Sequence, residues 1–305
     1  MQRNDVTIAI PLFNEERFIE AVIRTAAPQC QILLVSDNAS TDRSVEICRA
    51  LTSEFPNLSI IQQSSNLGAS ENFKFLLEKA TTSKFMWLGA HDLLPDGYVS
   101  ALDRALSSNL DAALAYGAAQ HIDIIGNPRS LFSYPYGHLL TDGSPQKRLL
   151  ALIRYLSDCS LVHGLFRREI LRLAWVSDKF LGVDQVLLGK ASLLGKFVYV
   201  PGTHLLRRDA HADDTKEKQL TRITGRPAHH GADLRELARR QYALACMAQD
   251  NGLAAVWYRM KARVLLIYRF GPFSKSPIVY VSEYVVWIIS CIPQAISYFR
   301  NKIAL

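Results

Sequence analysis

Cysteine is scarce in this chain of 305 residues, and its placement excludes two kinds of protein. The five cysteines are scattered, odd in number and form no CxxC pair. This pattern argues against a disulfide framework and a thiolate zinc site, and it favours a reducing compartment. The opening MQRNDVTIAIPLF also has no apolar stretch of the length that a secretory signal needs. We therefore expect a cytoplasmic protein.

A glycine-rich phosphate loop is missing too. No GxGxxG follows the first expected strand, which disfavours a nicotinamide dehydrogenase on a similar sheet. Apolar residues make up 49% of the chain, as in a globular protein rather than a disordered one. At this length we expect one domain with an appendage.

Acidic side chains are nearly missing from the last fifty residues. From residue 255 onward there are seven Lys or Arg and one acid, Glu283, so this end carries +6 of the net charge of +7. Its basic residues stand among aliphatic and aromatic ones, which fits a membrane surface better than nucleic acid. We expect a peripheral position on the cytosolic face of a membrane and no nucleic-acid partner.

An uninterrupted apolar run is also missing from the C-terminal end. Residues 278–299 are strongly apolar but contain Glu283, Pro293 and Gln294. A spanning helix needs about 20 mostly apolar residues with few charges. We interpret this segment as lying in the membrane interface or as a hairpin, and a helix packed on the domain core is the alternative.

The first half alternates short apolar runs with helical patterns. Expected strands are residues 6–11, 32–36, 58–61 and 85–88, and expected helices are residues 15–27, 42–53, 69–80 and 96–108. Such alternation indicates βαβ units, the α/β class and a mainly parallel sheet.

The second half is less regular. We expect strands at residues 112–116, 119–125 and 161–166, a loop over the site at 130–145, and helices at 146–157 and from Val183. The pattern predicts three regions: an α/β domain at residues 1–205, a flexible linker or flap at 206–230, and a helical, membrane-associating region at 231–305, with helices at 231–250 and 253–269.

Two strand ends carry the most informative residues. The first strand runs into PLFNEERF, with Asn14 and Glu15 in the turn, and the second stops at Ser36-Asp37-Asn38. Open α/β sheets bind ligands at the carboxyl ends of their strands. A carboxylate and an amide there, without a phosphate loop, indicate a site that reads the base and ribose of a nucleotide.

Five blocks in register resemble the family 2 glycosyltransferases, which have the GT-A fold. The blocks are PLFNEERFI, SDNASTD, SSNLGASENF, FMWLGAHDLLPDGY and GVDQVLLGKASLLG, and they lie within roughly residues 5–205. The resemblance implies a Rossmann-like sheet flanked by helices and transfer of a sugar from a nucleotide donor with inversion.

The resemblance also implies a set of donor-nucleotide residues. A carboxylate at Asp37 can accept the imide N–H of uracil or thymine. Asn38 stands where the family has a second acid, which leaves the base open, and Glu71 stands where the family often has an arginine. The competing interpretation of Asp37 is a helix N-cap, and Asp42 and Thr41 are expected to be caps rather than ligands. The full donor set is Pro11, Phe13, Asn14, Glu15, Asp37, Asn38, Asn66 and Gly68, with Gly68 allowing close backbone approach.

A metal site is implied where the strand at residues 85–88 ends. The family binds Mn²⁺ or Mg²⁺ there through an aspartate cluster, which neutralises the donor diphosphate. Here Gly89 and His91 replace aspartates, so Asp92 and His91 are the candidate ligands. His211 is a candidate third ligand. The alternative is that Asp92 caps the next turn and His91 is a polar strand-end residue.

The catalytic base is expected at Asp184. An inverting transfer needs a carboxylate that takes the proton of the attacking acceptor hydroxyl. Asp184 matches the family base by its place before an apolar helix, although its usual acidic neighbour is Val183 here. The alternative is a first-turn acid that stabilises the helix dipole. The preceding HGLFRREIL resembles the segment that shapes the acceptor pocket, and a solvated helix start is the other interpretation of Arg167 and Arg168.

These residues lead to one function and one rival. We expect a hexosyl- or deoxyhexosyltransferase that uses a UDP- or dTDP-sugar and a glycan acceptor, including a lipid-linked one, in surface polysaccharide or glycolipid synthesis. The rival is a catalytically degenerate GT-A domain that acts as a nucleotide-binding or scaffold protein, which Gly89, His91 and Glu71 favour. Retention of Asp92 and Asp184 argues against it.

Overall fold

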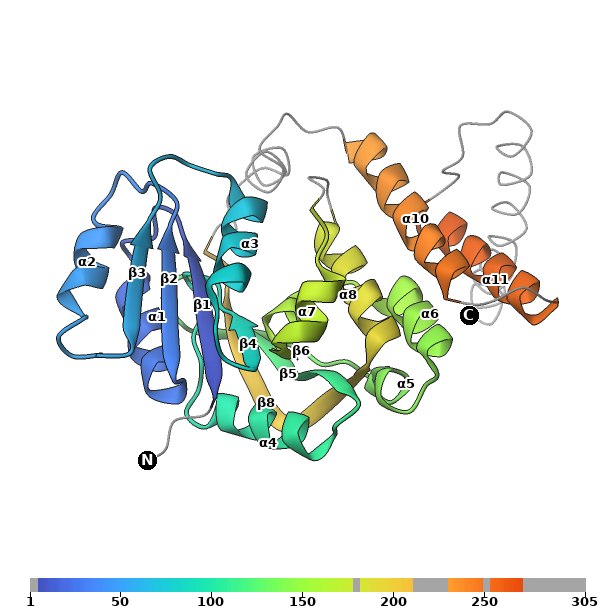
Figure 1. Ribbon diagram of the computed structural model, residues 1–305, viewed down its shortest axis with the longest axis horizontal. Coiled ribbons are helices and arrows are strands. Elements are labelled where there is room, and N and C mark those ends of the chain that lie inside the picture. The colour runs from blue at the N-terminus through green and yellow to red at the C-terminus, as the bar shows by residue number, and fades with distance from the viewer. Residues whose placement is uncertain (1–4, 178–181, 211–229, 249–252, 271–305) are drawn as a thin grey trace, which may run out of the picture.

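The computed structural model describes residues 5–177, 182–210, 230–248 and 253–270. One eight-stranded sheet forms its centre, with helices on both faces (Figure 1). The strands are β1 (Val6–Leu12), β2 (Ile32–Asp37), β3 (Leu58–Gln62), β4 (Lys84–Trp87), β5 (Ala112–Ile122), β6 (Pro128–Phe132), β7 (Leu165–Arg167) and β8 (Lys196–Arg208). The helices are α1 (Ile19–Ala26), α2 (Ser44–Ala50), α3 (Ala69–Lys79), α4 (Tyr98–Ser108), α5 (Gly137–Thr141), α6 (Pro145–Tyr155), α7 (Arg168–Ala174), α8 (Val183–Leu194), α10 (His230–Met247) and α11 (Leu253–Phe270), with 3-10 turns η1 (Ala27–Gln29) and η2 (Ser160–His163).

The expected βαβ half is confirmed. Strands β3, β2, β1 and β4 are neighbours in that order, and all three pairings are parallel. Helices α1 to α3 cross over between them, because right-handed connections between parallel strands need a crossover element. Strand β1 is apolar on both faces, since Ile8, Ala9 and Ile10 are all fully buried. Its carboxyl end therefore lies between covered faces, where a ligand site can form.

The prediction of a mainly parallel sheet is wrong for the second half, because the sheet is mixed. Strand β7 pairs antiparallel with β4 and with β5, and β6 also pairs antiparallel with β5. Strand β8 then returns parallel to β5 over almost its whole length, with two register irregularities. These pairings join segments far apart in the chain, so the local pattern does not reveal their direction.

Three local expectations also need correction. The two strands expected around residues 112–125 are one strand, β5, and β8 was not expected. The expected loop at 130–145 contains the end of β6 and the short helix α5. Residues 161–166 are mostly the turn η2 before the short β7. In each case pairing with distant strands decides the structure over the local signal.

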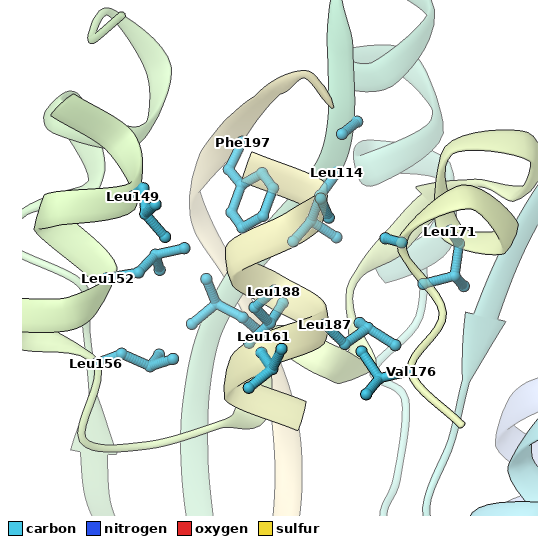
Figure 2. Close-up of a cluster of buried hydrophobic side chains, with 14 of the residues drawn as sticks. Leu114, Leu149, Leu152, Leu156, Leu161, Leu171, Val176, Leu187, Leu188 and Phe197 are labelled. Carbon is cyan, nitrogen blue, oxygen red and sulfur yellow. The ribbon is translucent and has the colours of Figure 1, made fainter. Parts of the chain in front are cut away.

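Two hydrophobic cores flank the sheet. One lies between the β1–β2 face and helices α1 and α4, with Ile19, Val22 and Leu102 fully buried. The other holds α3, α6, α7 and α8 against the opposite face. Figure 2 shows α8 surrounded by leucines from α6, η2 and α7, with Phe197 of β8 behind it. Packing of this density fixes α8, whose first turn carries the expected catalytic base.

Arg167 and Arg168 are not a solvated helix start. Arg167 donates from Nε to the Ala112 carbonyl at 2.9 Å and from Nη2 to the Leu106 carbonyl at 2.8 Å. Arg168 donates to the carbonyls of Thr82 and Ala80. Both guanidinium groups satisfy backbone acceptors at element ends, which is a structural role.

Within the described ranges, no helix is long and apolar enough to cross a membrane. Strand β8 runs to Arg208 and α10 begins at His230. Residues 211–229 of the expected linker and the apolar segment 278–299 lie outside the described residues. The division into three regions and the membrane association of residues 231–305 stay predictions.

Candidate active site

The loops after β1 and β2 are tied to each other. Thr41 N–H donates to Asn14 Oδ1 at 2.8 Å, and Asn14 N–H donates to Ser40 Oγ at 2.9 Å. Asn14 and Ala39 both have a left-handed backbone, with φ of 54° and 62°. Such a backbone is uncommon outside glycine and clusters at functional sites. The reciprocal bonds hold both strained residues in place.

Asp42 braces the same pair of loops, as expected of a cap. Its Oδ1 accepts the Ser44 N–H at the start of α2, and its Oδ2 accepts the Glu16 N–H, each at 3.0 Å. Burial raises the pKa of Asp42, but the hydrogen bonds from Ser44 and Glu16 outweigh it, so the pKa lies below its usual value. Arg43 N–H donates to Glu16 Oε2, which adds a further hydrogen bond between the two loops. Thr41 is bound to Asn14 and caps no helix.

Asp37 is fully buried at the end of β2. Both carboxylate oxygens lie 3.2 Å from the Ser40 N, which donates to them. Helix α2 begins seven residues later at Ser44, so Asp37 is not its N-cap. The carboxylate shapes the strained turn at Ala39 and lies directly under the loop where the nucleoside is expected.

Two amides of the expected donor set, Asn38 and Asn66, contact each other. Asn38 Nδ2 donates to Asn66 Oδ1 at 2.8 Å, and Asn38 Oδ1 accepts the Leu67 N–H at 2.8 Å. Asn66 Oδ1 also accepts the Gly68 N–H. Gly68 has a φ of 82°, and nothing lies within 4 Å of a Cβ built there. The positive φ favours glycine at this position, and the expected close approach to its backbone stays a prediction.

The candidate metal ligands have other partners. Asp92 is buried, and its Oδ1 accepts the Arg208 N–H at 2.9 Å, so it does not cap the next turn. A Cβ at Gly89 would lie 2.5 Å from Asp92 Oδ2, so glycine at this position leaves room for the carboxylate. His91 Nδ1 lies 2.9 Å from Glu15 Oε1 and forms a pair with it. In the part of the chain with described coordinates, no group of three or more His, Cys, Asp or Glu could hold a metal ion. These residues alone do not fit a protein-held Mn²⁺ or Mg²⁺ site, and His211 lies outside the described residues.

Asp184 lies in the first turn of α8. Its Oδ1 accepts the Gln185 N–H at 2.8 Å, and it is part-buried. Gly182 precedes it with a φ of 87°, and a Cβ there would meet Leu237 Cδ2 of α10 at 2.6 Å. Burial raises the pKa of the Cys159 thiol, and the adjacent Asp184 carboxylate, which accepts its hydrogen bond, raises it further. Helix α10 and Cys159 thus confine the expected base from two sides.

An ion pair that the sequence did not reveal lies beside Cys159. Arg207 Nη1 donates to Asp158 Oδ2 at 2.8 Å and to Ser160 Oγ at 2.6 Å. Burial alone would raise the pKa of Asp158, but the Arg207 charge and the Ser160 bonds lower it below its usual value. His121 connects this pair to Asp209, with Nδ1 lying 3.1 Å from Asp209 Oδ1. The local sequence around Asp158 does not distinguish it from an ordinary solvent-exposed acid in a loop.

The end of β8 joins the two groups of site residues. Arg208 binds on the donor side, with its N–H on Asp92 and its Nε on the His91 carbonyl. Arg207 binds on the other side, at Asp158. Consecutive residues of a strand point to opposite faces of the sheet, so the end of β8 contacts both groups of site residues. A continuous set of contacts therefore runs through Asp92, Arg208, Arg207, Asp158, Cys159 and Asp184.

His163 lies between these groups. Its Nδ1 is 3.1 Å from the Trp87 carbonyl at the end of β4. Burial lowers the pKa of His163, the Asp92 carboxylate opposes that shift, and the positive charge of Arg207 adds to it. The imidazole is therefore neutral at neutral pH, and the positive charge next to it is that of Arg207.

The arrangement suits transfer from an anionic nucleotide donor. The loops after β1 and β2 and the amides of Asn38 and Asn66 form one side of the site. Arg207 and Arg208 lie at the end of β8. On the other side, the part-buried carboxylate of Asp184 lies in the first turn of α8. A carboxylate near a bound electrophile can act as a general base.

Comparisons with known proteins agree with this geometry. Residues 7–173, more than half of the chain, match the model of Glycosyl transferase family 2. The chain is 30% identical over 115 residues to the uncharacterized glycosyltransferase YibD of Escherichia coli strain K12. That match covers 36% of this chain and 33% of YibD, so it spans about a third of the relative's length.

Solved structures share the fold at low identity. Staphylococcus aureus TarS 1–349 in complex with UDP-GlcNAc is similar with a TM-score of 0.63 and 15% identity, over 92% of this chain and 79% of that chain. The mannosyltransferase PcManGT of Pyrobaculum calidifontis, in complex with GDP-Man and Mn²⁺, is similar with a TM-score of 0.52 and 15% identity, over 96% of this chain and 87% of that chain. The α/β architecture with its mixed sheet is thus a GT-A fold, and the match over residues 7–173 shows that the chain belongs to glycosyl transferase family 2.

Proposed function

We propose that this protein is an inverting glycosyltransferase that moves a hexose or deoxyhexose from a UDP- or dTDP-sugar to a hydroxyl of a glycan acceptor. The acceptor belongs to the synthesis of a surface polysaccharide or glycolipid and is lipid-linked. The observation that carries the proposal is the junction at the end of β8, where Arg208 contacts Asp92 and Arg207 contacts Asp158 beside Asp184.

Asp184 is the proposed base. The acceptor hydroxyl attacks C1 of the donor sugar from the face opposite the nucleotide, and Asp184 takes the hydroxyl proton while the bond from C1 to the diphosphate oxygen breaks. The Asp184 carboxylate has one oxygen on the Gln185 N–H, which fixes its orientation. Leu187 and Leu188 of the same helix are buried, so the base sits on a rigid element.

The donor nucleoside is proposed to lie over the braced loops after β1 and β2. Asn14 is exposed there, and Phe13 is 42% exposed, so its ring is available to a base. Asp37 lies beneath and is our candidate acceptor for the imide N–H of a pyrimidine, once the ligand displaces the Ser40 N–H from one of its oxygens. Pro11 and Glu15 complete the proposed donor wall.

The leaving diphosphate needs positive charge near it. The described residues do not form a metal site by themselves, so the proposal assigns no step to a divalent metal. Arg208, whose Nε donates to the His91 carbonyl, is the proposed positive charge on the donor side. Two of the similar solved structures are complexes, TarS with UDP-GlcNAc and PcManGT with GDP-Man and Mn²⁺, which supports a nucleotide-sugar donor here.

The degenerate scaffold is the less favoured function. A scaffold has no need of a carboxylate at the head of α8, nor of glycine at position 89 to make room for Asp92. The family match also extends through the whole donor half.

Calorimetric titration of the full chain with UDP, dTDP, GDP and CDP tests the proposal, each in Mn²⁺ and in EDTA. We expect one pyrimidine diphosphate to bind. Binding that requires Mn²⁺ would mean that the diphosphate completes a metal site at Asp92, and equal binding in EDTA would assign the charge neutralisation to arginine. No binding of any nucleotide by a folded protein would favour the scaffold and refute the proposal.

A further inference from the structure

Helix α11 carries a line of exposed apolar side chains. Val256, Met260, Val264 and Tyr268 are 44%, 51%, 38% and 44% exposed. They are spaced four residues apart, so they follow one another along the helix surface. Single exposed apolar residues are ordinary, but four in a continuous line on one helix indicate an interaction surface.

The same helix is fixed to the domain by its other side. Ala262, Leu266 and Ile267 are fully buried, and Tyr258 is nearly so. The helix packs against α6 and α10, which lie beside it in Figure 1. Helix α11 therefore already has a core face, and the exposed line is a second apolar surface.

The charge of α11 has one sign. It contains Arg259, Lys261, Arg263 and Arg269 and no acidic residue. Lys261 is exposed next to Met260, and Arg259 is half-exposed. A further three basic residues and one acid follow in residues 271–305. An apolar line with basic residues on the same helix is complementary to an anionic lipid surface, which offers acyl chains under a layer of phosphates.

The end of α11 lies close to the expected acceptor side of the active site. Arg269 Nη1 donates to the Ile153 carbonyl at 2.6 Å, and Nη2 donates to the Leu156 carbonyl. Asp158 of the Arg207 ion pair follows two residues later. A membrane that contacts Tyr268 would thus come near the segment that leads to Asp158, on the side of the site proposed for the acceptor.

We propose that the exposed line Val256, Met260, Val264 and Tyr268 of α11 docks the protein onto an anionic lipid surface. The four side chains enter the boundary between headgroups and acyl chains, and Lys261 and Arg259 face the lipid phosphates. The inference deepens the proposed function, because it states where a lipid-linked acceptor would be met, but the docking itself requires no sugar transfer.

Cosedimentation of the full chain with vesicles tests the docking. The vesicles are phosphatidylcholine alone, or phosphatidylcholine with phosphatidylglycerol. We expect binding to the anionic vesicles that weakens with added salt. The double variant Met260→Asp with Val264→Asp should bind at least about tenfold more weakly, because apolar area that stays in water loses its transfer free energy. The matched control is Leu110→Asp with Leu173→Asp, two residues that are 85% and 64% exposed elsewhere, and it should bind like the unmodified chain.

Several outcomes would overturn the proposal. The first is that the double variant binds anionic vesicles as well as the unmodified chain does. The second is that the unmodified chain binds neutral and anionic vesicles equally. The third is that the unmodified chain binds no vesicles but forms a dimer in sedimentation velocity, which the double variant dissociates. Should the double variant fail to fold, Lys261→Glu decides: a several-fold loss on anionic vesicles supports the docking and unchanged binding refutes it. Nucleotide titration of the same variants separates the two proposals, since vesicle binding without nucleotide binding would refute the proposed function alone.

Discussion

The two halves of the site are held together by different forces. On the donor side, the loops after β1 and β2 are braced by hydrogen bonds between backbone N–H groups and the oxygens of Asn14, Ser40 and Asp42. On the proposed acceptor side, the thiol of Cys159 contacts Asp184, and the ion pair of Asp158 with Arg207 lies next to Cys159. The donor half uses local loop geometry, and the acceptor half uses charge brought together from distant segments.

This difference decides what each half tolerates. Loss of a hydrogen bond between neutral groups, such as those at Asn14 and Ser40, costs about 1 kcal/mol, whereas removal of one partner of a partly buried ion pair leaves an uncompensated charge. The acceptor half should therefore respond to substitution in both stability and chemistry, and the donor half mainly in nucleotide affinity. The following predictions test that contrast.

Asp184→Asn should have the largest effect. Without a base, turnover should fall by about 10²–10⁴-fold, while nucleotide affinity stays unchanged because the donor loops are intact. Steady-state transfer assays and calorimetry measure the two quantities. Asp111→Asn, at a surface pair with Lys196, is the matched control and should leave turnover unaltered. Unchanged turnover in Asp184→Asn would remove this residue from the mechanism.

Arg207→Met should lower the free energy of unfolding by about 2 kcal/mol, because it leaves the Asp158 carboxylate, which is 14% exposed, without its cation. The value is below that of a fully buried pair, since the Arg207 side chain is 34% exposed. Turnover should fall as well, because Asp158 and Cys159 border Asp184. Arg24→Met breaks an exposed pair with Glu54 and should cost clearly less than Arg207→Met in the same urea titration. Equal losses in both variants would contradict the contrast between the halves.

The contrast also explains which parts of the molecule the sequence could predict. Strands β1 to β4 were located to within about one residue because apolar runs and helical patterns are local signals. Asn14, Asp37 and Asn38 follow from the same logic, since they stand where those strands end. The positive φ of Gly68 was not predicted, because only the backbone reveals it.

The acceptor half could not be predicted as well, because its geometry depends on long-range pairing. Strand β8 pairs with β5 from Ala112↔Lys196 to Ile122↔Arg208, far apart in the chain, so neither its direction nor its extent is a local property. The partners of Asp158 and Asp92, Arg207 and Arg208, are contributed by that strand. Asp184 was found only through its matched block, and its contact with Cys159 needed the fold.

Gly68→Ala should act on the donor half alone. Its φ of 82° and ψ of 160° are strained for any residue with a side chain, at a cost of about 1–3 kcal/mol. Gly202 has a φ of 77° and also has nothing within 4 Å of a built Cβ, so Gly202→Ala is the matched control. Both variants should lose stability in thermal unfolding, but only Gly68→Ala should weaken nucleotide binding, because Asn66 Oδ1 accepts the Gly68 N–H and Asn38 Nδ2. Equal nucleotide affinity in both variants would show that the turn at Gly68 is not part of the donor site.

The smallest expected effect is on the stability of the fold in acid, where His163 and Asp158 should titrate in different pH ranges. Burial lowers the pKa of His163 below its ordinary 6.5, so the unfolded chain binds the proton first as the pH falls. The folded state therefore loses stability as the pH drops from about 6.5 toward the lower folded pKa. Asp158, whose pKa is also lowered, gives a separate loss only below its ordinary 3.8. His163→Asn removes the first titration, so the Tm of this variant should be flatter than that of the unmodified chain between pH 7 and 5 and should still fall at lower pH. A parallel fall in both proteins between pH 7 and 5 would assign the acid sensitivity to another group and leave the neutral state of His163 without support.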